Sequence, residues 1–481
     1  MGLLGILVGL SLLIWLAYRG WSILLLAPAT ALLAALFAGE PLLASWTQIF
    51  MGSAAQFVAQ FFPLFLLGAL FGKLMDDTGS VQAIARAMSA RLGLRRSILA
   101  VVLAGAIVTY GGVSVFVAFF VLGPMAIALF RQADIPRRLM PAAVALGTST
   151  FTMTALPGTP AIQNAIPMPF FGTTPFAAPG LGVIASAIML GFGLWWLARA
   201  EAAARRAGEG FGGDSAGAVA DDQLLRERAT AAREFDPAEI AHGQHSADDP
   251  PVWIAALPLL VVIAVNLLMS LFVLPRLDFS FLAKEQWGGT TLSAVAGVWS
   301  VAVALATATA ILIACNFRRL PSLRASMDAG ANASVLPILS VASLVGFGAV
   351  VAALPAFALV RDWVLSIEGG PLVSLAVATN VLAALTGSAS GGLTIALDAL
   401  GATYMQLAAQ YGIDPALMHR VAVIGAGTLD SLPHNGAVVT LLAVCGATHR
   451  ESYLDIVMVA IVGAIVALAA VIVLGSVFGS F

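Results

Sequence analysis

Long apolar stretches, separated by short polar segments, extend along most of this chain. They are rich in Leu, Ala, Val and Gly and lack the strict alternation of apolar and polar positions that marks a half-buried β-strand. Stretches of this length can cross a lipid bilayer as α-helices. The pattern therefore predicts an all-α polytopic membrane protein, and it argues against a membrane β-barrel.

Two of the apolar segments, 139–169 and 420–448, are interrupted near their centres. The first contains Pro157-Gly158-Thr159-Pro160 and the second Leu432-Pro433-His434-Asn435-Gly436. Proline and glycine remove helical hydrogen bonds, and unpaired backbone at membrane depth is tolerated only inside protein or beside a wet cavity. Broken helices in both halves of a chain are typical of a transporter's substrate site. A proline-rich external loop in each half is the alternative interpretation.

Two other segments, 98–130 and 371–411, are expected to form re-entrant hairpins. Their turns are predicted at Thr109–Ser114 and at Thr386–Gly392, where glycine and hydroxyl residues cluster. As a helix, the first arm of the first hairpin would span only about 18 Å, less than the roughly 30 Å of the hydrocarbon core. Arginines flank both ends of this hairpin, so we expect it to leave and return on one side of the membrane.

The same order of elements recurs in the two halves, which predicts two repeats. A polar linker, expected to be cytoplasmic, separates them and holds 17 of the 48 charged residues of the chain. The predicted division is N-terminal transmembrane helices in 1–48, a first repeat in 49–198, the linker in 199–250, connecting helices in 251–330 and a second repeat in 331–481.

Charge near the helix ends predicts that the two repeats are inverted. Residues 73–97 carry five basic and two acidic residues, a net charge of +3, whereas 354–370 carry one basic and two acidic residues, a net charge of −1. Cytoplasmic loops carry the excess of Lys and Arg. We therefore expect the first-half loops to face the cytoplasm, and the second-half loops, including 411–420 with Arg420, to face outward.

Composition supports this class of protein and excludes others. Hydrophobic residues make up 60% of the chain, charged residues 10%, and the mean hydropathy is +0.98. A soluble core does not absorb that much apolar surface. With a net charge of −2, the chain lacks the excess of positive charge that binding to nucleic acid requires. With neither a CxxC nor an HExxH motif, we expect no metal site and no enzymatic activity.

The motifs YGGVSVF, ALPGTPAIQN, TGSASGG and LDSLPHNGA together resemble those of the GntP family of permeases, over nearly the whole chain. The resemblance implies a multi-pass protein of a bacterial inner membrane, built from inverted repeats. It also implies import of a small hydroxy-carboxylate, such as gluconate or 3-hydroxybutyrate, by proton symport. Leu156-Pro157 stands where gluconate permeases carry a histidine-proline pair, and the chain is closer to a branch labelled hydroxybutyrate permease. The resemblance thus implies a monocarboxylate without specifying gluconate.

Four polar interruptions, 109–114, 154–164, 386–392 and 430–436, are expected to converge near the middle of the membrane. Free N–H groups at helix ends attract carboxylates, and hydroxyl and amide groups can bind a hydroxy acid. Alternatively, the small residues only allow helices to pack closely. The candidate substrate-binding residues are Thr109, Gly111, Gly112, Ser114, Thr154, Gly158, Thr159, Asn164, Thr386, Ser388, Ser390, Ser431 and Asn435.

Three ionisable residues are candidates for proton coupling. Asp430 and His434 flank the second break, and Asp398 follows the second hairpin turn. Charges inside the membrane are costly and point to function, and histidine titrates near neutral pH. The alternative is that these residues pair structurally.

The expected binding partners are a small hydroxy-acid anion and the lipid bilayer, with a homodimer left open. No cofactor is expected beyond the coupling ion, and sodium is the rival to the proton because hydroxyl-rich turns could bind it. None of the four interruptions contains Lys or Arg. We therefore expect the anion to be held by helix dipoles, hydroxyl groups and protonated His434.

Overall fold

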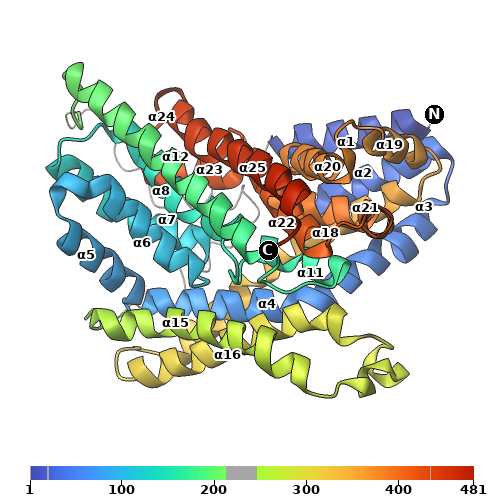
Figure 1. The fold of residues 1–481 in the computed structure, drawn as a ribbon, viewed down its shortest axis with the longest axis horizontal. Coiled ribbons are helices and arrows are strands. Elements are labelled where there is room, and N and C mark those ends of the chain that lie inside the picture. The colour runs from blue at the N-terminus through green and yellow to red at the C-terminus, as the bar shows by residue number, and fades with distance from the viewer. Residues whose placement is uncertain (1, 19–20, 213–245, 247, 434) are drawn as a thin grey trace.

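The computed structural model describes residues 2–18, 21–212, 246, 248–433 and 435–481, and this part of the chain is built from helices (Figure 1). Seven of the described helices are long and apolar enough to cross a membrane. The all-α, multi-pass architecture expected from the sequence is therefore confirmed. The inverted relation of the two halves stays a prediction.

The described α-helices of the first half are α1 (Gly2–Tyr18), α2 (Ile23–Ala38), α3 (Leu42–Ala44), α4 (Met51–Asp77), α5 (Ser80–Leu92), α6 (Ser97–Tyr110), α7 (Val115–Gln132), α8 (Met140–Thr148), α9 (Phe151–Thr154), α10 (Ile162–Ala165), α11 (Pro167–Phe171) and α12 (Pro179–Arg206), with a π-helical turn, Ser45–Phe50, joining α3 to α4.

The second half contains α15 (Val252–Leu268), α16 (Leu292–Asn316), α17 (Leu323–Ala333), α18 (Val335–Ala353), α19 (Phe357–Leu365), α20 (Gly370–Thr386), α21 (Ala389–Tyr411), α22 (Pro415–Thr428), α23 (Gly436–Val444), α24 (His449–Ile456) and α25 (Gly463–Phe478). A 3-10 turn, Leu429–Ser431, follows α22, and a π-helical turn, Val457–Val462, joins α24 to α25.

Helix α4 crosses the middle of the molecule and contacts both halves (Figure 1). Helices α16, α17 and α18 pack against it, and α15 packs against α16. In Figure 1, α5 to α8 lie above α4 at the left, and α1, α2 and α18 to α21 lie above it at the right. Helices α12 and α25 run side by side, with α22 packed against α25. Elements from both halves of the chain therefore meet at the centre.

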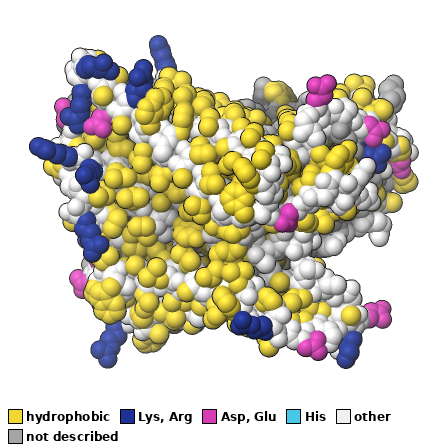
Figure 2. Space-filling model, viewed as in Figure 1, with side chains coloured by type: hydrophobic (Ala, Val, Ile, Leu, Met, Phe, Trp, Pro, Cys, Tyr) yellow, Lys and Arg dark blue, Asp and Glu magenta, His cyan; other side chains and the backbone are white. Residues whose placement is uncertain are grey.

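Apolar side chains cover most of the visible surface, while Lys and Arg gather along one edge (Figure 2). That edge contains α5 and the C-terminal end of α12 (Figure 1). Large apolar side chains remain exposed away from it, for example Leu43 at 74% and Trp195 at 56%. Exposed apolar surface on this scale matches a protein surrounded by lipid.

A contact between backbones holds α6 against α8. A Cβ atom at Gly147 would lie only 2.3 Å from the carbonyl oxygen of Val102, so no other residue fits at this crossing. The Thr109 hydroxyl donates to Gly105 O at 2.8 Å and to Gly147 O at 3.3 Å. Small residues thus bring the end of α6 next to the first broken segment.

A buried ion pair within α4 is hydrogen-bonded to α17. Lys73 Nζ lies 2.9 Å from Asp77 Oδ1, both side chains have no exposed surface, and Ser326 Oγ donates to Asp77 Oδ2 at 2.6 Å. These two charges belong to the segment 73–97, which was expected to be a cytoplasmic loop, but α4 extends through Asp77. Because the two residues are one helical turn apart, they share a face and neutralise each other. Without the pair, the segment retains its net charge of +3 (four basic minus one acidic).

We expect Asp77→Asn to destabilise the fold because it leaves the Lys73 ammonium buried without a countercharge. Breaking one partner of a buried pair costs about 3–5 kcal/mol, whereas replacing both by apolar groups is often neutral. Thermal unfolding in detergent should therefore show a clear loss of stability for Asp77→Asn. The double variant Lys73→Met/Asp77→Leu should stay near the wild type. Equal stability of the two variants would contradict this account.

Candidate functional site

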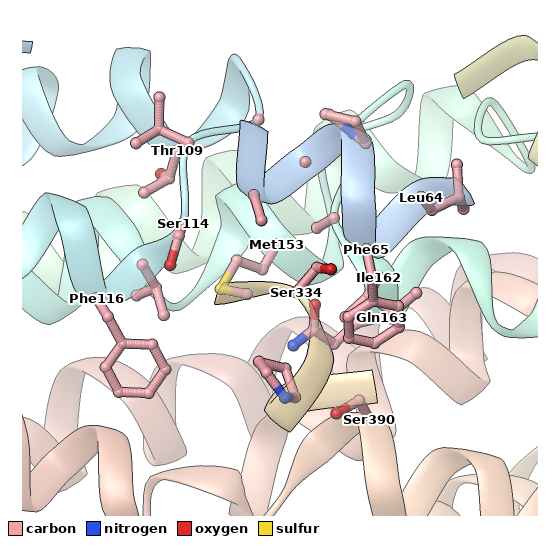
Figure 3. A pocket seen from close by; sticks show the side chains of 18 of the residues that line it. Leu64, Phe65, Thr109, Ser114, Phe116, Met153, Ile162, Gln163, Ser334 and Ser390 are labelled. Carbon is pink, nitrogen blue, oxygen red and sulfur yellow. The ribbon is translucent and has the colours of Figure 1, made fainter. Parts of the chain in front are cut away.

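A cavity of about 190 Å³, the central cavity, lies where several of the predicted interruptions meet (Figure 3). Its lining comes from the turn between α6 and α7, the first broken segment, the second hairpin turn, α4, α16 and the junction of α17 and α18. The polar side chains in the lining are Thr109, Ser114, Gln163, Ser334 and Ser390, and the larger apolar ones include Leu64, Phe65, Phe116, Met153, Ile162, Leu305 and Val341.

The turn between α6 and α7 needs glycine at its second position. Gly112 has φ +100°, a left-handed conformation, and a Cβ atom there would lie 3.0 Å from Pro160 Cγ. Ser114 then begins α7 as its N-cap, although its side chain makes no capping hydrogen bond. This geometry places the first turn of α7 in the cavity wall, directly against the broken segment.

The first broken segment is unwound between α9 and α10, yet its backbone is well braced. Gly158 N donates to Pro175 O at 2.8 Å, and Gly158 O accepts from Asn266 Nδ2 at 2.9 Å. Asn164 Nδ2 donates to Thr159 O at 3.1 Å and to Pro175 O at 3.0 Å. These contacts replace the lost helical hydrogen bonds and leave residues 160–163 to form one wall of the cavity.

Gln163 carries an unused acceptor in this wall. The residue is 7% exposed, and its Oε1 atom has no hydrogen-bond partner among the described residues. Buried polar atoms are nearly always paired, so an unpaired one calls for an explanation. Because Gln163 lines the cavity, as Ser334 and Ser390 do from other elements (Figure 3), a bound hydroxyl group would supply the missing donor.

The second hairpin turn is stabilised by its own hydroxyl groups. Ser388 caps α21 by accepting from Gly391 N at 3.1 Å, and its Oγ lies 3.2 Å from Ser390 Oγ. The Thr386 hydroxyl donates to Leu382 O at 2.8 Å and Ser388 O at 3.1 Å. Ser390 is therefore the hydroxyl of this turn that lines the cavity.

The second broken segment connects to this turn rather than lining the cavity. Asn435 caps α23 and donates from Nδ2 to Gly387 O at 2.8 Å and to Asp430 Oδ1 at 2.7 Å. Ser431 O accepts a hydrogen bond from the Tyr453 hydroxyl at 3.2 Å. Asp430 is thus linked through a single asparagine to the hairpin turn that carries Ser390.

Four of the predicted substrate-binding residues line the cavity: Thr109, Gly112, Ser114 and Ser390. The hydroxyl of Thr109 is already used within the fold. The other predicted residues lie outside the lining and support its walls: Gly111, Thr154, Gly158, Thr159, Asn164, Thr386, Ser388, Ser431 and Asn435. Gly111, for example, packs on α15, where a Cβ atom would lie 2.3 Å from Leu259 Cδ2.

The coupling candidates do not line the cavity where the structure describes them. Asp398 is exposed on α21. Asp430 is partly exposed and bound to Asn435. His434 lies outside the described residues.

Sequence reasoning missed several lining residues, among them Gln163, Met153, Ser334 and the α4 residues Leu64 and Phe65. Ser334 carries the same sequence signal as the other breaks, a polar residue followed by a proline within an apolar run. It interrupts the apolar span between α17 and α18, and Pro337 follows three residues later. Leu64 follows Pro63, a proline inside α4.

A buried arginine reaches the first broken segment from α22. Arg420 has no exposed surface, and its guanidinium donates to Ala177 O at 2.7 and 3.2 Å, to Thr154 O at 3.1 Å and to Asn164 Oδ1 at 3.3 Å. The expectation that Arg420 belongs to an outer loop is therefore wrong, because α22 begins at Pro415 and carries this residue into the protein. A cation does stand at the first break, although it comes from another element.

His419 completes this cluster. Its Nδ1 lies 2.6 Å from Thr173 Oγ1, and its Nε2 lies 3.1 Å from Asn164 Oδ1. Asn164 thus contacts both residues of α22, and the adjacent Gln163 lines the cavity.

Residues 1–169 match a family described as GntP family permease. The chain is 41% identical over 470 residues, 96% of both sequences, to the uncharacterized transporter YxjC of Bacillus subtilis. It is also 38% identical to the high-affinity gluconate transporter of Escherichia coli over 104 residues, which is 21% of this chain and 23% of that protein.

The fold is similar to that of MtrF from Neisseria gonorrhoeae, a member of a class of antimetabolite efflux pumps. The TM-score is 0.53, with 12% identity, over 89% of this chain and 83% of MtrF. At this identity the likeness concerns the fold alone. The extended similarity to the Bacillus transporter and the family match agree with the membrane-spanning fold. The chain belongs to the GntP family of permeases.

Proposed function

We propose that this permease imports a small hydroxy-carboxylate by proton symport and that the central cavity is the substrate site. The observation that carries the proposal is the cavity itself, where two hairpin turns and a broken segment meet. Irregular backbone of this kind occurs at membrane depth where it encloses a binding site. The similarity to a gluconate transporter supports an organic anion as the substrate.

The volume of the cavity favours a short-chain acid. A cavity of about 150 Å³ holds benzene, so the 190 Å³ found here suits a ligand of roughly seven non-hydrogen atoms. 3-Hydroxybutyrate has about seven such atoms and gluconate about thirteen. The lining also supplies apolar contacts from Phe65, Met153 and Leu305, which match a methyl-bearing chain better than a polyol.

Two groups of polar contacts suit the two ends of such a molecule. The first turn of α7, at Ser114 and Val115, faces the cavity, and the first N–H groups of a helix have no partner within it. A carboxylate is stabilised there by these donors and by the helix dipole. Gln163, Ser334 and Ser390 then remain for the hydroxyl group of the substrate.

Uptake into proteoliposomes tests this function. We expect radiolabelled 3-hydroxybutyrate to accumulate under an inward proton gradient, with gluconate competing weakly because it exceeds the cavity. A sodium gradient at equal pH should produce no accumulation. Uptake driven by a sodium gradient alone would mean that sodium, and not the proton, is the coupling ion. A preference for gluconate over 3-hydroxybutyrate would contradict the size argument.

We expect Gln163→Leu to retain or increase stability while lowering substrate affinity at least tenfold. The substitution removes a buried acceptor that costs about 1–3 kcal/mol when unpaired, and the substrate loses a hydrogen bond. Thermal unfolding and the KM for uptake measure the two effects. Thr440→Val is the matched control, because Thr440 also has a buried unpaired hydroxyl but lies outside the lining. Unchanged KM in Gln163→Leu would remove this residue from the site.

We also propose that Asp430, together with His434, carries the coupling proton. Asp430 is connected to the cavity by Asn435, which bonds both Asp430 and the second hairpin turn. A co-bound proton would offset the charge of the anion. Substrate and proton would then stabilise each other in the site.

Asp430→Asn should abolish proton-driven accumulation but preserve counterflow, which needs no net driving force. His434→Ala should weaken accumulation and shift its pH dependence. Asp362→Asn, on exposed α19, serves as the control. Normal accumulation in both test variants would move the coupling site elsewhere, with Asp398 the next residue to examine.

A further inference from the structure

The Arg420 guanidinium is buried without a countercharge among the described residues. Its acceptors are two backbone carbonyls and the neutral Asn164 side chain. A buried cation is stable only when hydrogen bonds or an opposite charge compensate its lost hydration. Here carbonyl and amide oxygens satisfy the N–H groups, while the full positive charge remains. The site is therefore suited to receive an anion.

A second cavity of about 500 Å³ lies beside the segment that Arg420 contacts through Ala177. It is lined by Phe171–Thr174, Phe176–Pro179, Asp414–Ala416, Ser480 and Phe481. Arg420 contacts Ala177 in the wall of this second cavity, and it contacts Thr154 and Asn164, the immediate neighbours of Met153 and Gln163 in the wall of the central cavity. Arg420 itself lines neither cavity, but its guanidinium bonds a residue in the wall of the second and the neighbours of two residues in the wall of the first.

Asp414 is the acidic side chain in the lining of the second cavity. One of its carboxylate oxygens caps α22 by accepting from Ala416 N at 2.8 Å, and the other accepts from the Ser480 hydroxyl. Both oxygens are therefore engaged at the first turn of α22. Asp414 forms no hydrogen bond with Arg420, which lies further along the same helix.

We propose that Arg420, beside the walls of both cavities, is a carboxylate-binding residue, and that Asn164 Oδ1 is the internal acceptor that an incoming carboxylate displaces. The inference rests on the proposed function, since it concerns the same class of substrate. It adds a recognition step outside the central cavity, at which the negative charge of the substrate is selected.

Displacement of Asn164 is chemically favourable. Its hydrogen bond to Arg420 Nη1, at 3.3 Å, is the longest of the four that the guanidinium makes. A carboxylate can accept two parallel N–H groups from a guanidinium, and such charge-assisted bonds are about twice as strong as neutral ones. A lysine in this place could not offer the same planar pair of donors.

Displacement of Asn164 would also affect the wall of the central cavity. Asn164 and Gln163 are consecutive residues of the short helix α10, with Asn164 facing Arg420 and Gln163 lining the cavity. Releasing Asn164 would loosen its bonds to Thr159 O and Pro175 O, which brace the broken segment. Carboxylate binding at Arg420 would thereby loosen the wall of the central cavity at Gln163.

Ligand-induced thermal stabilisation of the purified full-length protein tests this proposal. The probes are 3-hydroxybutyrate and its neutral amide, 3-hydroxybutyramide, compared in the wild type, Arg420→Gln, Arg420→Lys and Asn164→Asp. Asn164→Asp retains the shape of the side chain but gives the guanidinium an internal carboxylate. Arg361→Gln is the matched control, because Arg361 is an exposed arginine on α19.

We expect the acid to bind the wild type and Arg361→Gln at least tenfold more tightly than the amide. Arg420→Gln and Asn164→Asp should reduce this preference to what the first turn of α7 alone provides, and Arg420→Lys should reduce it less. A merely structural arginine would change melting temperature without changing the ratio of acid to amide affinity.

If Arg420→Gln or Asn164→Asp prefers the acid over the amide as strongly as the wild type does, the proposal is overturned. If Arg420→Gln does not fold, Asn164→Asp decides, because it keeps the arginine. A wild type that shows no preference for the acid, and no uptake of it, would overturn the proposed function as well. If the wild type takes up the acid normally and the variants keep the wild-type ratio of acid to amide affinity, only the role of Arg420 is overturned.

Discussion

The structure depends on how the unwound backbone around Pro157 is paired inside the membrane. Peptide groups that leave a helix at membrane depth need partners from the protein or from a wet cavity. Asn266 from α15, Arg420 from α22 and the Pro175 carbonyl supply partners for Gly158, Thr154 and Asn164. Because these groups come from three separate segments, the broken segment can form only when both halves of the chain have packed together.

Local sequence signals revealed the breaks but not what surrounds them. Prolines, glycines and hydroxyl residues within apolar runs correctly indicated the turn at Gly112 and the unwound stretch at Gly158. Those signals come from backbone chemistry, which neighbouring residues determine. The residues of α4 in the cavity carry no comparable mark beyond Pro63, because an apolar side chain facing a cavity looks the same in sequence as one facing lipid.

Charged residues were the hardest to place from sequence. Lys73 and Arg420 lie near the ends of apolar segments, where Lys and Arg usually reach the membrane surface, and both are fully buried. Only the partners of these two residues distinguish them from surface cations. Lys73 pairs with Asp77, one turn away on the same helix, whereas Arg420 bonds carbonyl oxygens more than two hundred residues away in the sequence. The first partnership can be read from spacing, whereas the second requires the tertiary fold.

The close crossing of α6 and α8 has a mechanical consequence. With Gly147 against the Val102 carbonyl, and Thr109 bonded across the crossing, the two helices cannot slide past each other without separating. The first hairpin and α8 would therefore move as one rigid body, whereas the wall that α4 and the α17–α18 junction form can shift without disturbing this crossing.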